Sequence, residues 1–382
     1  MRGEGQPIAL LDAGGFFGAA SLSTSSLEDQ IRGDYLLQAM SGLDYDAVNL
    51  GGPDTRFGEA FLSGHLAGAT FDVVSSNLHR ADGSLYTASS TTQTFGDYSV
   101  GIVGVMADAY ADGVARDSDA AGEPLDVSDA SSSAAAAVAE VAGSDLVVLL
   151  AFASPADAAA LGAALPDVDV VVASADDTPA TAATRDGDPW LVRAGYDGKW
   201  VVRLDLDEAD GAWSERGSGA VEMSEDWPDE PTMAALYQDY LTELAGAAAD
   251  IVAGIEQEVP VGGSYVGSAT CATCHPAQTA HWEGTPHSHA FDTLVQTNHD
   301  YSPSCYSCHT VGFGYVGGFL LPDETPDRMD VGCEMCHGAG EEHVAAPGPG
   351  WALETTDQCI GCHTEEDSPQ FDLEAYLPAV VH

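Results

Sequence analysis

All eight cysteines of this 382-residue chain lie beyond residue 270, and they follow one strict pattern. The two cysteines of each pair are separated by two residues, and a histidine follows each pair directly. We call these segments the first to fourth motifs: Cys271/Cys274/His275, Cys305/Cys308/His309, Cys333/Cys336/His337 and Cys359/Cys362/His363. Structural zinc or a disulfide framework is the alternative. Zinc sites, however, need no histidine directly after every pair, and disulfides need no histidine at all.

The C-x-x-C-H pattern is typical of covalent c-type haem attachment. The two thiols bind the haem, and the adjacent histidine becomes the proximal ligand of the iron. The sequence therefore predicts four covalently attached c-type haems. Because haem is attached to such motifs outside the cytoplasmic membrane, we expect the protein in the periplasm, at the cell surface or outside the cell. No apolar run is long enough to predict a membrane-spanning helix.

The four motifs are crowded into the last third of the chain. Their first cysteines are 34, 28 and 26 residues apart. A segment this small cannot build a conventional core around four macrocycles, so we expect closely stacked haems to form most of its core. Electrons can pass between haems packed in this way, and electron transfer is the predicted function.

The remaining histidines supply candidates for the second axial ligand of each iron. Twelve histidines less the four in the motifs leave eight, and six of these eight lie among the motifs. The six are His281, His287, His289, His299, His343 and His382. Two imidazoles per iron would make the haems low-spin, with lower potentials than haems that have a methionine ligand. His65 and His79 lie outside this region, and we expect both to be ordinary surface side chains.

The chain has 61 acidic residues and only 11 basic ones, and the resulting formal charge of -50 argues against negatively charged partners. Nucleic acid and anionic membrane surfaces are held by clustered lysine and arginine. The composition favours a halophilic protein, since high salt screens the self-repulsion of so acidic a surface. An acidic surface that attracts a cationic partner or divalent ions is the alternative.

Residues 1–231 are expected to form a layered α/β domain, because short, fully apolar strands are typical of a sheet covered on both faces. The expected strands are 8–13, 47–50, 71–75, 99–106, 145–152, 168–173, 190–194 and 200–206, with helices over 33–42, 56–67, 130–142 and 155–164. Residues 232–260 are expected to form a connecting helix that packs on this domain, followed by a linker. Residues 261–382 are expected to form a small, haem-packed, mostly helical or irregular domain.

The C-terminal segments resemble the multihaem cytochromes of the ammonia-oxidiser, cytochrome c-554 type. The resemblance rests on YVGSATCATCHPAQTAHWEGTPHSHAFDTL, CYSCHTVGFGYVGGF, VGCEMCHGAGEEH and CIGCHTEEDSPQFDLEAYLPAVVH. It implies that His287 (or His289), His343 and His382 are distal haem ligands. His299 is a further candidate from the residue count. The family also includes a haem with one open axial position.

The N-terminal segments LLDAGGFFG, AVNLGGPDTRFG, FDVVSSNL, DLVVLLAFAS and DVVVASADD resemble the 5'-nucleotidase type of metallophosphoesterase. That resemblance implies a two-metal site, but the ligand positions hold Gly15, Gly52, Pro53, Phe152, Ala175 and Asp177, so almost every metal ligand is gone. The family's first Asp-x-His strand also has no counterpart. Without ligands no two-metal clamp can activate water. We therefore expect a degenerate scaffold without phosphoesterase activity.

These observations give three functional hypotheses. The first is an extracytoplasmic tetrahaem electron carrier that serves redox partner proteins or extracellular acceptors. The second is self-association of this carrier into a conductive extracellular filament, in which one subunit donates a histidine to a neighbour's haem. The third is an oxidoreductase with one open haem that acts on a small nitrogen or oxygen species.

Overall fold

The computed structural model describes residues 6–18, 26–114, 124–175, 178–185, 187, 189–224, 226–349, 356–364 and 367–382. The chain divides into two compact units. One comprises Met1–Ala20 with Gly33–Leu236 and is called the α/β unit below. The other comprises Ser21–Arg32 with Tyr237–His382 and is called the haem-motif unit.

The main sheet of the α/β unit has five strands in the order β10-β9-β8-β6-β5. Their bounds are β5 Ser90–Phe95, β6 Tyr98–Met106, β8 Leu146–Phe152, β9 Val170–Ala173 and β10 Trp190–Arg193. Only β5 runs antiparallel to its neighbour. Along β8, Leu149 lies in one apolar cluster and Leu150 in the cluster on the opposite face. The sheet is therefore buried on both faces, which confirms the layered α/β fold predicted from its apolar strands.

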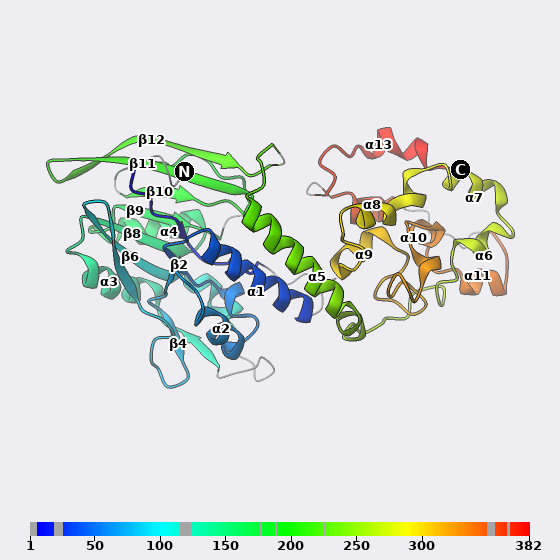
Figure 1. The fold of residues 1–382 in the computed structure, drawn as a ribbon, viewed down its shortest axis with the longest axis horizontal. Coiled ribbons are helices and arrows are strands. Elements are labelled where there is room, and N and C mark those ends of the chain that lie inside the picture. Colours follow the sequence, from blue (N-terminus) through cyan, green and yellow to red (C-terminus); the bar gives the residue numbers. More distant parts are fainter. Residues whose placement is uncertain are drawn as a thin grey trace. The chain divides into compact units, whose positions relative to one another are not determined.

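Smaller sheets complete the α/β unit (Figure 1). Strands β1 (Leu11–Asp12), β2 (Ala47–Asn49) and β3 (Asp72–Val74) form a parallel sheet. Strands β4 (Leu78–Arg80) and β7 (Leu125–Val127) pair antiparallel, as do the long strands β11 (Trp200–Ala209) and β12 (Ala212–Glu222). The helices of the fold are α1 (Ser26–Gly42), α2 (Glu59–Leu66), α3 (Ala130–Val141) and α4 (Pro155–Ala163).

Each of the eight expected strands overlaps an observed one, whereas β4, β5, β7 and β12 were not predicted. Strand β5 shows the reason. Its sequence, STTQTF, is largely polar, and its side chains are half-buried or exposed at the sheet edge. An edge strand is held by backbone pairing, so its sequence needs no apolar run.

Helix α5 (Pro231–Ala253) contributes to the haem-motif unit from Tyr237 onward. Its buried residues Leu241, Leu244, Ala248 and Ile251 recur at helical spacing. Ala248 packs in an apolar cluster with Phe291, Tyr306 and Phe319 of the haem-motif unit. The expectation that this helix packs on the α/β domain therefore holds only for its first residues, up to Leu236, and is corrected for its buried stripe, which lies in the haem-motif unit.

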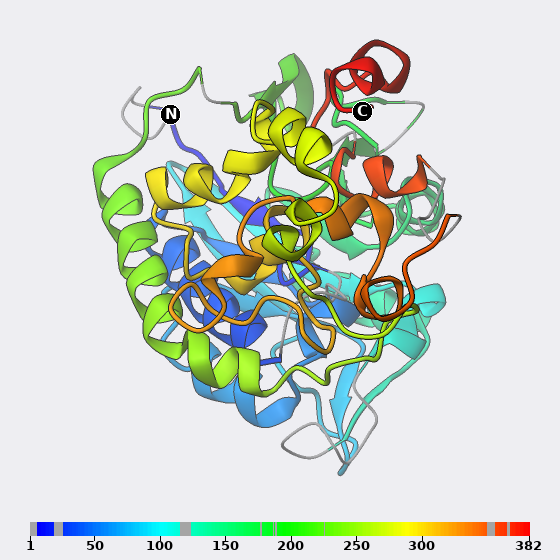
Figure 2. The ribbon, with the colours of Figure 1, turned by 90° about the vertical axis from the view of Figure 1, so that its right-hand side faces the viewer.

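The rest of the haem-motif unit consists of short helices linked by loops, coloured yellow to red in Figure 2. They are α6 (Ser268–Ala272), α7 (Pro276–Trp282), α8 (Ala290–Gln296), α9 (Pro303–His309), α10 (Cys333–His337), α11 (Glu341–Ala345), α12 (Asp357–Cys362) and α13 (Leu373–Tyr376). Besides any haem, this unit has a protein core around Tyr306 and Phe319, whose ring centroids are 4.8 Å apart. Among the helices that the structure describes, none combines the length and apolar character needed to cross a membrane.

Candidate haem-binding site

Each motif forms one helical turn. The second and third motifs lie within α9 and α10, and the fourth begins within α12. In the first motif, α6 ends at Ala272, but the turn continues because the His275 amide donates to the Cys271 carbonyl at 2.9 Å. Residues three and four apart lie on one face of a helical turn. This geometry places both thiols and the histidine of each motif where one haem can contact all three.

The motif helices contact one another in a definite order. Helix α6 contacts α10, α10 contacts α12, and α12 contacts α9. The thiol of Cys271 lies within hydrogen-bonding reach of Cys333, and the thiol of Cys308 within reach of Cys362. The first motif is therefore adjacent to the third, and the second is adjacent to the fourth.

The cysteines of the motifs differ in exposure. All eight are free thiols in this structure; six are half-buried, whereas Cys274 and Cys336 are exposed. Cys274 and Cys336 therefore lie at the surface of the polypeptide in the haem-motif unit. Cys271, in the same turn as Cys274, takes the inward position beside Cys333. Attachment of haem to the Cys274 thiol stays a prediction from the motif.

Three motif histidines each face a histidine from elsewhere in the unit. The ring centroids of His275 and His343 are 6.2 Å apart, and those of His363 and His287 are 6.1 Å apart. His337 lies 5.8 Å from His382. With metal–nitrogen distances of about 2.0 Å, two imidazoles on opposite sides of one metal ion have centroids about 6 Å apart. These three pairs thus have the spacing of two axial ligands, so the residues present fit haem iron.

Burial keeps two of these paired rings in the form that binds metal. Desolvation, and then the neighbouring His363, lower the pKa of His287. Desolvation, followed by His382 and His275, lowers the pKa of His337. Both rings therefore favour the neutral imidazole, the form in which histidine coordinates metal.

His309 of the second motif differs from the other three motif histidines. All twelve histidines of the chain lie in the described segments, and no other histidine ring is paired with His309. Its Nδ1 lies 2.8 Å from the Ala290 carbonyl oxygen, the type of contact that orients a metal-binding imidazole through its other nitrogen. The second motif therefore has an oriented proximal histidine without a histidine opposite it.

Of the other candidate histidines, His289 and His299 lie apart from these pairs, whereas His281 lies beside one of them. His289 is exposed, and its Nδ1 lies 3.4 Å from Asp292. His299 Nε2 lies 2.7 Å from the Tyr237 hydroxyl. The His281 ring is 5.8 Å from that of His382. No motif histidine faces His289 or His299 in this structure, and their roles as ligands stay predictions.

Sequence reasoning missed Glu334, the residue after the first cysteine of the third motif. It is 2% exposed, and its carboxylate accepts backbone hydrogen bonds from Val266 (2.9 Å), Gly267 (2.6 Å) and Gly340 (2.8 Å). Val266 and Gly267 directly precede α6. Glu334 therefore ties the third motif to the start of the first. The sequence gives no signal for this contact, because one more acidic residue between two motif cysteines does not stand out in so acidic a chain.

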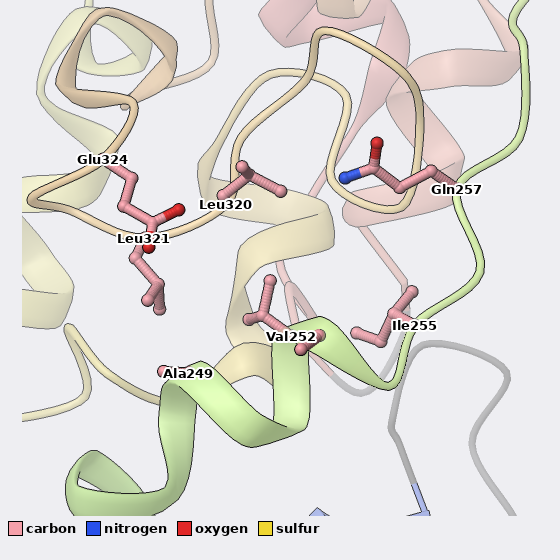
Figure 3. Close-up of a pocket in the computed structure, with 8 residues that line it drawn as sticks. Ala249, Val252, Ile255, Gln257, Leu320, Leu321 and Glu324 are labelled. Carbon is pink, nitrogen blue, oxygen red and sulfur yellow. The ribbon is translucent and has the colours of Figure 1, made fainter.

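A cavity of about 340 Å³ lies away from the motifs. Its lining is mainly apolar and comes from the end of α5, from the residues that follow this helix and from residues 320–324 (Figure 3). Val252 and Ile255 line one side, and Leu320 and Leu321 the other. None of the candidate haem-binding residues lines this cavity, so we assign it no part in haem binding.

The ligand positions of the two-metal centre that the sequence resemblance implies lie in the α/β unit. A Cβ atom added at Gly15 or at Gly51 would lie only 2.5 Å from the ring of Phe152. The ring therefore fills the space beside both glycines and offers no ligand atom. Gly52, Pro53 and Ala175 also lack ligand side chains. Asp177 lies outside the described residues. At the ligand positions that the structure describes, the residues do not fit a two-metal centre.

A buried carboxylate organises these loops instead. Asp54 accepts backbone hydrogen bonds from Gly15 (2.7 Å), Gly51 (2.7 Å) and Phe17 (3.1 Å). Burial raises the pKa of Asp54 to about 7, although the three N–H groups act in the opposite direction. Asp54 thus has a structural role in holding two loops together.

Comparison with known proteins agrees with the motif geometry. Residues 270–338 match the family described as cytochrome c554 and c-prime. Cytochrome c-554 of Nitrosomonas europaea is 31% identical over 99 residues, which cover 22% of this chain and 42% of that protein. The chain thus spans less than half the length of this relative. The match confirms the resemblance seen in the sequence and supports covalently bound c-type haem and electron transfer in this region.

Solved structures show the fold of the rest of the chain. The 5'-nucleotidase precursor of Thermus thermophilus has a TM-score of 0.53 and 23% identity over 67% of this chain and 53% of its own. The NAD nucleotidase of Haemophilus influenzae has a TM-score of 0.52 and 14% identity over 68% of this chain and 55% of its own. At such low identity the likeness concerns the fold alone. The predicted metallophosphoesterase-like fold of the N-terminal domain is confirmed.

Proposed function

We propose that this protein carries four c-type haems and passes electrons along them outside the cytoplasmic membrane. The observation that supports this most strongly is the pairing of His275, His337 and His363 with histidines at the spacing of two axial ligands. The cysteines of the four motifs, the exposed Cys274 included, hold the haems covalently. When bound, the haems supply one-electron redox chemistry, and the protein fixes their ligands and surroundings.

The contacts between motif helices support an order for the electron path. The first motif adjoins the third, the third adjoins the fourth, and the fourth adjoins the second. Electrons would therefore pass from the haem of the first motif to those of the third, fourth and second motifs in turn, or in the reverse direction. This order differs from the order of the motifs in the sequence. Glu334 holds the first step of this order through its bonds to Val266 and Gly267.

The haem count is tested by the intact mass of the purified native protein under denaturing conditions. We expect the mass of the polypeptide plus four haems, together with a reversible change in the visible spectrum on reduction. A mass that corresponds to fewer than four haems would contradict the proposal.

A second candidate function is favoured by the unpaired His309 ring. The haem of the second motif would then have one open axial position, at which a small nitrogen or oxygen species would bind to the iron directly. We expect a high-spin component in the oxidised spectrum and carbon monoxide binding by about one haem in four after reduction. A fully low-spin spectrum without carbon monoxide binding would leave electron transfer alone.

The proposed partners are redox proteins, extracellular electron acceptors and further copies of this chain. In a filament, His289 or His299 would be available to a neighbouring subunit, because neither faces a motif histidine of its own chain. Electron microscopy of native protein tests this form of the proposal. Monodisperse single molecules at high salt would contradict it.

A further inference from the structure

Glu28 is an unusual acidic residue in this chain, because its side chain is fully buried whereas most acidic residues are exposed. It lies near the start of α1, in the segment that belongs to the haem-motif unit. A buried carboxylate is costly unless it accepts hydrogen bonds. Its contacts therefore indicate what it does there.

The carboxylate of Glu28 binds the beginning of the second motif. Its Oε1 accepts a hydrogen bond from the Ser304 amide at 3.1 Å. Ser304 is the residue before Cys305. It lies in the first turn of α9, whose own N-cap residue, Ser302, makes no capping bond with its side chain. Glu28 thus supplies from α1 the acceptor that α9 lacks locally.

The groups around Glu28 come from three helices. Asp29 and Arg32 lie on its own helix, and Arg32 is ion-paired with Asp29. Tyr240 of α5 and Cys305 and Tyr306 of α9 lie near enough for the charge of Glu28 to raise their pKa values. Desolvation is the main effect on this carboxyl and raises the pKa of Glu28, against the Ser304 hydrogen bond and Arg32, which lower it.

We propose that Glu28 is a positioning residue for the second haem, which fixes the start of its motif helix and lowers its reduction potential by placing a buried negative charge beside Cys305. The inference rests on the proposed function, since it requires a haem at Cys305 and Cys308. A negative charge stabilises the oxidised haem relative to the reduced haem. An ionised Glu28 therefore lowers the potential, and a protonated Glu28 does so much less.

The two roles are separated by two substitutions. Glu28→Gln removes the charge but keeps an oxygen that can accept from Ser304, whereas Glu28→Ala removes both. Asp239→Asn is the matched control, because it removes the same charge from an exposed position on α5 directly before Tyr240. All variants are compared as full-length protein with their haems bound.

The readouts are a redox titration between about pH 5 and pH 9 and amide hydrogen exchange of residues 303–309. In the wild type we expect one potential to fall as pH rises through the raised pKa of Glu28. In Glu28→Gln that potential should lose its pH dependence and rise at high pH. A tenfold change in the reduction equilibrium is about 59 mV for one electron. We expect a shift of that order, with exchange unchanged. Glu28→Ala should show the same shift and faster exchange.

The inference is overturned if all four potentials of Glu28→Gln keep the wild-type pH dependence, if Asp239→Asn shifts them equally, or if Glu28→Ala leaves amide exchange unchanged. These results are distinct from a failure of the proposed function. A protein with fewer than four haems would be recognised by its mass before any variant is compared.

Discussion

At the scale of single residues, the paired histidines are the feature on which the haem assignments depend. Each pair joins a motif histidine to one distant in sequence, so the role of each ring can be tested separately. His343 faces His275 in a half-buried position, whereas His289 is exposed beside Asp292.

We predict that His343→Ala leaves the first haem with one protein ligand. The oxidised spectrum should gain one further high-spin haem, because the imidazole that completes the low-spin coordination is lost. His289→Ala is the control and should keep the wild-type spectrum. The measurement is the electron paramagnetic resonance spectrum of the oxidised protein. An unchanged spectrum in His343→Ala would show that this histidine is not the distal ligand.

Asp54 gives a prediction on the pH dependence of stability. Its pKa is raised by burial from 3.8 to about 7, so the folded state binds this proton more tightly than the unfolded state. Its contribution to stability is complete below about pH 4 and is lost as pH rises through 7, by up to about 4 kcal/mol. We predict that Asp54→Ala destabilises the α/β unit by about 3 kcal/mol at pH 5, because buried N–H groups lose their acceptor.

The difference between wild type and Asp54→Ala should shrink at pH 8, where the wild type must hold a buried charge. Urea unfolding at both pH values measures this difference. Asp97→Ala, at an exposed turn, is the control and should behave like the wild type at each pH. A difference that grows between pH 5 and pH 8 would contradict the raised pKa.

At the scale of elements, α5 shows how a helix can be predicted correctly and placed correctly only in part. The helical spacing of its apolar residues predicted the helix, but the same spacing is compatible with packing against any apolar surface. The packing of Ala248 against Phe291 and Tyr306 became visible only in the folded chain. Similarly, β12 has a polar sequence and was missed, because its pairing with β11 depends on backbone bonds along the hairpin.

We predict that Ile251→Ala destabilises the haem-motif unit by about 2–5 kcal/mol, since it opens a cavity in a fully buried position. Asp250→Ala, on the exposed face of the same helix, should change stability by less than about 0.5 kcal/mol. Thermal unfolding followed at the haem absorbance measures both. Equal effects of the two substitutions would indicate that α5 does not pack in this unit.

At the scale of the whole molecule, the charge of -50 sets a condition on stability and on assembly. The Debye length falls from about 30 Å at 0.01 M salt to about 3 Å at 1 M. We predict that the melting temperature rises mainly over this range, where repulsion between surface carboxylates is screened. Any self-association should weaken when the salt concentration is lowered over the same range, because the repulsion between the acidic chains is then screened less. Melting curves and sedimentation at a series of sodium chloride concentrations measure both effects.

A melting temperature that rises only above 1 M salt would point to exclusion of salt from the protein surface rather than to screening. A melting temperature that does not depend on salt would contradict the halophilic interpretation of the composition. The acidic surface would then be better explained by attraction of a cationic partner.

The sequence by itself determined the chemistry of attachment and the main layers of the fold. Four C-x-x-C-H motifs need only one helical turn each, and the apolar runs of strands such as β8 need only a sheet buried on both faces. Both are local patterns, so they can be recognised without knowing the fold. The absence of the ligands that the metallophosphoesterase resemblance implies was also visible, because the side chains of glycine and phenylalanine offer no metal-binding atom.

The tertiary structure decided which groups meet. It paired His275 with His343 and His287 with His363, it left His309 without a facing histidine, and it brought Glu28 to the second motif from 276 residues earlier in the chain. It also placed the ring of Phe152 beside Gly15 and Gly51. Contacts between distant residues depend on how loops close and on which side chains fill the same space. No local pattern records these, and they emerge only when the whole chain packs.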